Sequence, residues 1–313
     1  MKPSRRRVLK TSSAVLAASS LGSLARAGGV SRSKNAPFVY CLNTSTISGQ
    51  KLPLVSELEL AAKVGFSAVE PWIREIETYV KGGGSLPDLR KRIEDLGLSI
   101  EDCIGFARWI VDDDAERAKG LEQAKHDMDL AVQIGSKRIA APPMGATDRN
   151  DMNLAKVSER YRALLELGDK MGIVAMVELW GHSKTIGNLS EAAHVAIGSH
   201  HPKACILPDI YHLYKGGSDP TSLRLLSASA IQMIHFNDYP ANPARETIKD
   251  ENRIFPGEGI APIAQILKDL RAMGGTTVLS LELFNRQYWK LDAQVCARTG
   301  LEKMKAAVEK SMA

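Results

Sequence analysis

The feature that most constrains this chain is an eightfold alternation of short apolar segments with longer amphipathic ones. The segments with strand character lie at 38–43, 68–72, 99–104, 138–142, 174–179, 204–209, 232–236 and 277–283. Most of them are near-continuous apolar runs, as strands covered on both faces require. Eight parallel strands, each followed by a helix, close into a barrel, so we predict an α/β fold with a single-domain (β/α)₈ barrel, the TIM barrel.

The segments between the strands predict helices that end at glycine. The helices are expected at 54–64, 86–96, 115–134, 154–171, 190–197, 223–228, 263–273 and 293–310. A glycine follows five of them, where a left-handed residue stops a helix. These glycines are Gly65, Gly97, Gly135, Gly172 and Gly274. An open doubly wound sheet is the alternative, but the glycine fingerprint that usually follows its first strand is missing after Asn43.

The first 27 residues have the pattern of an export signal. Ser4-Arg5-Arg6-Arg7-Val8-Leu9-Lys10 contains an arginine pair, a short apolar stretch follows, and Ala25-Arg26-Ala27 resembles a cleavage site. The apolar stretch is shorter than the ~20 residues of a spanning helix. We expect a Tat-type signal peptide at 1–27, cleaved after about Ala27, and a barrel at 28–313. The protein is then exported to the periplasm by the Tat machinery without stable membrane insertion; an uncleaved anchor is the alternative.

The signal accounts for the basic charge of the chain. The whole chain has 41 Lys+Arg and 36 Asp+Glu, a net charge of +5. Residues 1–27 hold six basic residues and no acid, so residues 28–313 have 35 basic and 36 acidic residues and a net charge of −1. This balance gives no support to nucleic acid as a partner. The four cysteines lack metal-binding spacing, so we expect free, mostly buried thiols.

Metal-binding side chains occur at the ends of the last four predicted strands. They are Glu178, Asp209, His235 and Glu282. The carboxyl ends of barrel strands share one pocket, and a charged group costs several kcal/mol to bury unless it is paired. Three carboxylates and one imidazole suit Mn²⁺ or Mg²⁺ and tolerate Co²⁺ or Zn²⁺. We therefore predict one divalent metal ion here; four separately satisfied polar groups are the alternative.

The order of these residues is similar to that of a known family. A glutamate on strand five, Asp209-x-x-His212 on strand six, His235-x-x-Asp238 on strand seven and a glutamate on strand eight resemble the xylose isomerase-like barrel superfamily. Its sugar phosphate isomerase/epimerase branch includes ketose 3-epimerases, hydroxypyruvate isomerases and inosose dehydratases. The segment Pro256-Gly257-Glu258-Gly259 also resembles a turn of that branch. The resemblance extends from about residue 38 to residue 310.

The resemblance implies a metal-dependent sugar isomerase or epimerase. In this reading the four residues bind the ion, and Glu178 and Glu282 also move protons on the two faces of a keto-sugar or related polyol. Removal of a proton next to a carbonyl leaves an enediolate, which a metal ion stabilises. One carboxylate can take that proton and a second can return it elsewhere.

Four further polar residues near strand ends are candidates for binding the substrate. They are His212, Glu70, His182 and Arg286. The resemblance implies that His212 contacts substrate oxygens. Glu70 could bind a hydroxyl group or a side-chain partner. His182 could reach a substrate hydroxyl or belong to a surface loop, and Arg286 could bind an anionic or hydroxyl-rich substrate or be a solvated loop residue. Trp72, Trp109 and Trp180 could form an aromatic wall for a sugar or belong to the packing.

Three other functions stay open at this stage. A dehydratase or lyase on a keto-sugar or keto-inositol begins with the same proton abstraction and then expels a hydroxyl group. A non-catalytic sugar-binding barrel would keep the fold without turnover, which the two glutamates disfavour. A nuclease related to AP endonucleases would need more histidines from the early strands and a basic surface.

Overall fold

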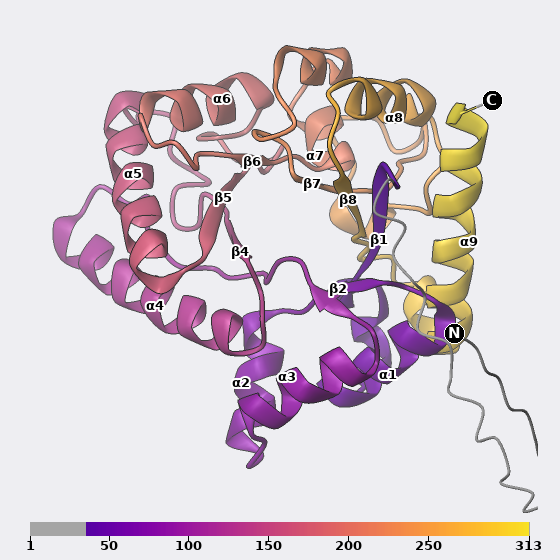
Figure 1. Cartoon of the computed structure of the whole chain (residues 1–313). Helices are drawn as coiled ribbons and strands as arrows, with labels where there is room; N and C mark the ends of the chain where they lie inside the picture. The colour runs from indigo at the N-terminus through magenta and orange to yellow at the C-terminus, as the bar shows by residue number, and fades with distance from the viewer. Residues whose placement is uncertain (1–35, 313) are drawn as a thin grey trace, which may run out of the picture.

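The computed structural model describes residues 36–312 (Figure 1). The predicted signal peptide lies outside the described residues. Eight short strands form within the described part: β1 (Phe38–Asn43), β2 (Ala68–Glu70), β3 (Ser99–Ile100), β4 (Arg138–Ala141), β5 (Val174–Glu178), β6 (Ile206–Leu207), β7 (Met233–His235) and β8 (Thr277–Leu281).

Helices surround the ring of strands, as Figure 1 shows. The α-helices are α1 (Leu54–Val64), α2 (Ile73–Lys81), α3 (Leu86–Asp95), α4 (Asp114–Gln133), α5 (Leu154–Met171), α6 (Leu189–Gly198), α7 (Ile210–Lys215), α8 (Ile263–Ala272) and α9 (Ala293–Met312). Short 3₁₀ helices are η1 (Thr44–Gln50), η2 (Pro220–Leu225), η3 (Asp250–Asn252) and η4 (Tyr288–Lys290).

The strands close into a parallel barrel in chain order. Five strands pair in the order β3-β2-β1-β8-β7, and three in the order β4-β5-β6. Backbone hydrogen bonds join the two groups at both seams: Ala140 N–H donates to Cys103 O, and His235 N–H donates to Pro208 O. A parallel bridge between Asp209 and His235 continues the second seam toward the carboxyl ends of the strands. The predicted (β/α)₈ barrel is confirmed.

Apolar side chains fill two layers. A small cluster inside the barrel includes Cys41, Met176, Leu207 and Met233, all fully buried. A larger cluster lies between the strands and the surrounding helices. Burial on both faces explains the apolar strand sequences, because each strand face needs a nonpolar neighbour. The four cysteines are free and buried, as expected.

Local signals set several helix ends. Gly65 and Gly172 adopt left-handed conformations at the ends of α1 and α5, with φ of 105° and 78°. Asn188 begins α6 by accepting a hydrogen bond from the Glu191 N–H. These residues stop or start helices because they satisfy backbone groups that have no partner inside the helix. Between residues 36 and 312, no helix is long and apolar enough to cross a membrane.

Two helices differ from the prediction. Helix α2 fills the segment between the second strand and the Gly82-Gly83-Gly84 run, for which no helix was predicted. Helix α7 begins directly after Asp209, and the helix predicted at 223–228 is replaced by η2, which ends at Leu225. Asp209 causes the early start, because its side chain accepts a hydrogen bond from the His212 N–H and caps α7.

Candidate metal centre

The four predicted ligands meet at the carboxyl end of the barrel. Glu178 and His235 are the last residues of β5 and β7, Glu282 follows β8 directly, and Asp209 lies just beyond β6. All four are buried, with at most 4% of any of them exposed. Ligand atoms of Asp209, His235 and Glu282 all lie within 4.8 Å of one another. The strand ends thus bring together the residues that the sequence had singled out.

One buried nitrogen marks the centre of this group. The Nδ1 atom of His235 lies 3.0 Å from Glu282 Oε2 and 3.4 Å from Asp209 Oδ2. Glu178 Oε1 is 3.7 Å from the same nitrogen. Within residues 36–312, no donor or acceptor makes a well-formed hydrogen bond to this Nδ1 atom. A buried polar atom without such a partner is costly, and three oxygens converging on it fit a divalent cation.

The other ring nitrogen of His235 pairs with a buried carboxylate inside the barrel. Its Nε2 atom lies 3.1 Å from Glu70 Oε1, inside the barrel. A metal-binding histidine commonly donates its second N–H to a carboxylate, which fixes the ring and its tautomer. Glu70 is fully buried and is not among the residues that line the pocket. Of the two roles open to Glu70, the pocket was favoured; the structure shows the other, a side-chain partner, because Glu70 lies inside the barrel against His235.

An asparagine that the sequence analysis did not single out connects two of these carboxylates. The Asn43 amide donates to Glu70 Oε2 at 2.8 Å and to Glu282 Oε1 at 3.3 Å. Its carbonyl oxygen accepts from the Trp72 indole N–H at 3.0 Å and from the Ser45 N–H at 2.9 Å. Asn43 therefore orients Glu282 so that its Oε2 atom faces His235.

Asp209 is also fixed from several sides. Besides capping α7, it accepts hydrogen bonds from the Asn237 amide, 3.2 Å from both carboxylate oxygens. Burial alone would raise the pKa of Asp209, but Arg253, His212 and His235 together outweigh burial and hold the pKa well below its usual range. Asp209 is therefore an anion at neutral pH, which suits a metal ligand.

Arg253 is the second functional residue that the sequence analysis missed. Its Nη1 atom lies 2.7 Å from Asp209 Oδ2 and 2.7 Å from Glu282 Oε2. Its Nη2 atom contacts Asp250 at 2.5 Å, and the guanidinium carbon lies 4.6 Å from the centre of the Tyr211 ring. This cation offsets part of the negative charge that the carboxylates bring to a buried site.

The buried environment raises the pKa values of two predicted ligands, Glu178 and His235. Burial, together with the charge of Glu282, raises the pKa of Glu178 to about 8, although His235 opposes the shift. Burial would lower the pKa of His235, but Glu282 and Glu70 outweigh it and raise this pKa well above its usual value. Without an ion, the site therefore holds protons that a metal must displace.

His212 lies beside the site and is kept neutral. Burial lowers the pKa of His212 to about 3, although Asp209 opposes this shift. The Gly181 N–H donates to its Nδ1 atom at 3.2 Å. Arg253 Nη2, which can only donate, lies 3.0 Å from the Nε2 atom, so both ring nitrogens face N–H donors. His212 also lines the pocket. Its position fits the predicted contact with substrate oxygens.

A pocket of about 460 Å³ includes two of the four predicted ligands, Glu178 and Glu282, among its lining residues. Glu178 and Glu282 lie in its wall, with aromatic side chains around them: Trp72, Phe106, Trp180, Phe284 and Trp289. Trp72 packs against Phe106 with ring centres 5.1 Å apart. This size and composition fit a small-molecule site with a few convergent polar groups.

The other predicted substrate contacts lie at the rim of this pocket. His182 stacks on Trp180 with ring centres 5.5 Å apart. Arg286 is exposed and forms a 2.8 Å ion pair with Glu251. Trp109 is 1% exposed and donates to Pro142 O, so it belongs to the packed core and not to the aromatic wall.

The Gly-Glu-Gly turn is bound to the strand that carries His235. The Asp238 carboxylate accepts hydrogen bonds from the backbone N–H groups of Gly257, Gly259 and Ala261. A Cβ atom on Gly259 would lie 2.2 Å from Tyr239 O, so this close approach requires glycine. The turn therefore fixes the loop between β7 and α8, which carries Arg253.

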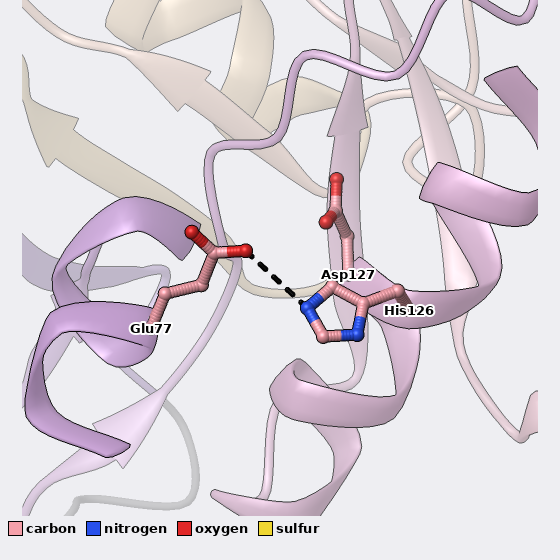
Figure 2. Close-up of side chains that lie close together, drawn as sticks. All are labelled: Glu77, His126 and Asp127. Carbon is pink, nitrogen blue, oxygen red and sulfur yellow. Dashed lines mark hydrogen bonds and ion pairs between the residues drawn. The ribbon is translucent and has the colours of Figure 1, made fainter. Parts of the chain in front are cut away.

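A second group of potential metal ligands lies away from the strand ends. Figure 2 shows Glu77 of α2 facing His126 of α4, with their ion pair of 3.3 Å drawn as a dashed line and Asp127 beside them. The His126 side chain is 55% exposed, and Asp127 accepts a hydrogen bond from Gln123. These residues already have partners, so the group around His235 is the stronger metal centre.

The fold and the site agree with a comparison with protein families. The family model described as xylose isomerase-like TIM barrel matches residues 58–307. The chain belongs to this family. The identification fits the closed barrel and the placement of the four predicted ligands on its last four strands.

Members of the xylose isomerase-like TIM barrel family with different activities are similar to this chain. Inosose isomerase of Bacillus velezensis is 25% identical over 275 residues, which are 86% of this chain and 97% of that protein. The 3-dehydroshikimate dehydratase of Pseudomonas putida is 24% identical over 264 residues, 83% of this chain but 40% of that protein. The relatives thus include both isomerases and dehydratases.

Solved structures of the family share the architecture. The IOLI protein, whose crystal structure has a bound zinc atom, superposes with a TM-score of 0.79 at 21% identity. The superposition covers 87% of this chain and 99% of the other. At this level of identity the likeness establishes the fold.

Proposed function

We propose that this protein is a metal-dependent isomerase or epimerase of a keto-sugar or keto-inositol. The observation that carries the proposal is the convergence of Glu178 and Glu282 on one point in the pocket wall, beside His235 Nδ1. Two carboxylates at one point can remove a proton from one carbon and return a proton at another position or face. The similarity to an inosose isomerase supports this substrate class.

Glu178, Asp209, His235 and Glu282 would hold the ion. Their mostly oxygen donor set favours Mn²⁺ or Mg²⁺, with Co²⁺ or Zn²⁺ as alternatives. A bound divalent ion supplies positive charge that stabilises an enediolate. The aromatic residues of the pocket exclude water from the apolar face of the substrate, which strengthens the electrostatic interactions inside.

In this proposal two glutamates transfer protons, and the other residues of the pocket bind the substrate. Glu178 and Glu282 exchange a proton with the carbon next to the substrate carbonyl. His212 contacts substrate oxygens, and Arg253 offers N–H groups to them at the same wall. His182 and Arg286 bind hydroxyl or anionic groups at the rim.

Exchange with heavy water tests the role of the two glutamates. A panel of ketoses and keto-inositols is incubated in D₂O with Mn²⁺-loaded protein, and deuterium at the carbon next to the carbonyl is followed by NMR. The wild type should incorporate deuterium. Glu178→Gln and Glu282→Gln should each slow exchange by ~10²–10⁴-fold, the usual contribution of a general base.

The control is Glu122→Gln, an exposed change on α4 that should exchange at the wild-type rate. The comparison is made at equal metal occupancy, measured by elemental analysis. Wild-type exchange in either glutamine variant would remove that glutamate from the mechanism. A metal-loaded wild type that exchanges no substrate of the panel would favour a binding protein.

A dehydratase is the second candidate, and the similarity to 3-dehydroshikimate dehydratase favours it. It would start with the same proton abstraction, after which a protonated group would deliver a proton to the departing hydroxyl. Glu178 could do so after it has taken the proton from the substrate carbon, because it is then the protonated group. The NMR experiment separates the two, since a dehydratase gives an unsaturated product and releases water.

A further inference from the structure

The group of potential ligands between helices α2 and α4 has no part in the proposed reaction. Glu77 of α2 and His126 and Asp127 of α4 each offer one ligand atom, and these three atoms all lie within 4.8 Å of one another. Figure 2 shows the side chains gathered around one space, with the Glu77 carboxylate on one side and the His126 ring and Asp127 carboxylate on the other. One imidazole and two carboxylates are a donor set that Zn²⁺ accepts in proteins.

The spacing of Glu77 and His126 fits two ligands of one zinc ion. The Nε2 atom of His126 lies 3.3 Å from Glu77 Oε1. Zinc bonds to nitrogen and oxygen of about 2.0–2.2 Å at a tetrahedral angle place neighbouring ligand atoms roughly 3.3–3.5 Å apart. The other oxygen of Glu77 pairs with exposed Lys81 at 3.4 Å, so that pair does not occupy Oε1. The His126 side chain is 55% exposed, so its ring has room to adjust to an ion.

Asp127 is a buried carboxylate without a cation. It is 1% exposed, and its Oδ1 atom accepts one hydrogen bond, from the Gln123 amide at 2.8 Å. Within residues 36–312, its other oxygen accepts no hydrogen bond, and no lysine or arginine forms an ion pair with it. A buried charge is costly unless it is paired, and burial accordingly raises the pKa of Asp127 to about 6. A divalent ion would supply the charge that this carboxylate lacks.

A cavity beside the group gives access to it and room for a further ligand. It has a volume of about 410 Å³, and Glu77 and Asp127 are among the residues that line it. Two cations of the same cavity, Arg108 and Lys119, pair with Glu116 at 3.1 Å and 2.8 Å. They therefore leave the charges of Glu77 and Asp127 to another partner, and a water molecule in the cavity could complete the coordination of an ion.

We propose that Glu77, His126 and Asp127 form a second metal site, in which Zn²⁺ joins α2 to α4 and a water molecule from the adjoining cavity is the fourth ligand. The site shares no residue with the metal centre at the strand ends, so the two bind ions independently. Ile104 and Phe106 line both the cavity and the substrate pocket, so the second ion lies in the helical layer next to one wall of that pocket.

Counting zinc ions in variants tests the second site separately from the first. Chelator-treated, tag-free protein is titrated with Zn²⁺ by calorimetry, and bound zinc is counted by elemental analysis. Wild type should bind two ions per chain, Asp209→Ala one, and Asp209→Ala with His126→Ala none. In the Asp209→Ala background, His126→Ala should weaken zinc binding by at least ~10–100-fold, since loss of a partner behind a ligand already costs this much.

The matched control replaces another exposed histidine of a helix. His194 lies on α6, and His194→Ala should bind as many zinc ions as wild type. Thermal unfolding adds a second readout. Zn²⁺ should raise the midpoint of Asp209→Ala but not that of the double variant, because only the native state holds the three ligands together.

Crystals of wild type soaked in Zn²⁺ give a direct test if Asp209→Ala fails to fold. Anomalous scattering at the zinc edge should show a peak about 2.0–2.2 Å from the ligand atoms of Glu77, His126 and Asp127. Absence of this peak, or a second ion that His126→Ala retains, would overturn the inference. A single ion that only Asp209→Ala removes would do the same and leave the proposed function intact. An ion between α2 and α4, with none at the strand ends, would support this inference and refute the other metal centre.

Discussion

Arg253 supplies the positive charge that holds together two carboxylates of the predicted metal site, Asp209 and Glu282. Its side chain is 1% exposed and forms ion pairs with Asp209, Glu282 and Asp250. Two of these partners are also predicted metal ligands, so the same oxygens contact a fixed cation and face the position of the ion. The residue therefore connects the stability of the protein with its metal content.

Replacement of Arg253 should reveal this connection. Arg253→Met leaves Asp209 and Glu282 buried without their cation, so the free energy of unfolding of the metal-free protein should fall by about 3–5 kcal/mol. Mn²⁺ should restore part of the loss, because it neutralises the same carboxylates. Urea denaturation in chelator and in Mn²⁺ measures both values.

The control for this prediction is an exposed arginine of the same pocket. Arg286→Met breaks a surface ion pair with Glu251 and should cost less than about 1 kcal/mol. If Arg253→Met were as stable as wild type in chelator, the ion pairs of Arg253 would have no net stabilising role.

Metal binding should release protons. The raised pKa of Glu178, about 8, means that this carboxyl is mostly protonated at pH 7 without metal, and the pKa of His235 is raised as well. Because an ion needs both ligands deprotonated, affinity should increase as the pH rises toward about 8. Calorimetry in two buffers with different ionisation enthalpies counts the protons. Equal affinity at about pH 6 and pH 8 would contradict this assignment.

At this scale the sequence predicted the residues that converge at the strand ends better than the residues that hold them in place. Glu178, Asp209, His235 and Glu282 stand out because each is polar within an apolar strand end. Arg253 lies in the long loop after β7, where no periodicity points to it, and its one signal is the apolar Ile254-Phe255 pair that follows. The role of Glu70 depends on which face of β2 points inward, which two strand neighbours cannot fix.

Among the elements, the contact between α1 and α2 contains a second pair of acids. Glu57 of α1 is 2% exposed, and its Oε2 atom has no hydrogen-bond partner in the described chain. Glu75 of α2 accepts from the Thr44 hydroxyl at 2.7 Å and the Trp72 N–H at 3.0 Å. Burial and the charge of Glu75 raise the pKa of Glu57 to about 9.

This pair should make the helix contact lose stability as the pH rises from about 4.5 to about 9. The pKa of Glu57 is about 9 when folded and near 4.5 when unfolded, so its contribution is full below pH 4.5 and is lost as the pH rises toward 9. Glu57→Gln has no charge to bury. At pH 8 the variant should exceed wild type by at least about 1.4 kcal/mol, the equivalent of one pKa unit.

Urea denaturation at two pH values measures this difference. The gain of Glu57→Gln over wild type should shrink toward zero near pH 4.5, because both side chains are then neutral. A gain of the same size at both values would show that packing, and not ionisation, explains the variant.

The predicted elements failed where an element was short or continued an apolar run. Helix α2 has a strongly amphipathic sequence. It lies between the end of the second strand and a glycine run, and this whole segment was interpreted as a loop. Helix α7 follows β6 with no break in apolar character, so no signal in the sequence indicated that a helix begins right after the predicted strand at 204–209. Longer elements such as α1 and α5 were predicted with their true bounds, because their periodicity extends over several turns.

At the scale of the whole molecule, closure of the barrel turns distant sequence positions into neighbours. The bond between Asn43 and Glu282 joins residues 239 positions apart, and it exists because β1 pairs with β8. The number of strands and their alternation with helices were sufficient to predict this closure. The side-chain network inside the barrel was not predictable, because it depends on the register between strands.

We propose that the Tat route exports the whole folded barrel, which would allow the ion to be bound before transport. Replacing Arg5 and Arg6 with lysine should retain the protein in the cytoplasm, because the receptor reads the arginine pair. Cell fractionation followed by immunoblotting measures the distribution. Arg90→Lys, a surface change on α3, is the control. Unchanged export in the double variant, or in a host without the Tat system, would refute this route.

The predicted ligands come from one half of the barrel, and part of the pocket wall comes from the other half. All four predicted ligands come from β5 to β8, whereas Ile104 and Phe106 form part of the pocket wall beyond β3. Both side chains are apolar, so neither can form a hydrogen bond or an ion pair with a predicted ligand. An evolving lineage could therefore exchange these wall residues and acquire a new substrate while its metal chemistry stays in place, so gene duplication in this fold offers an accessible route to new specificities.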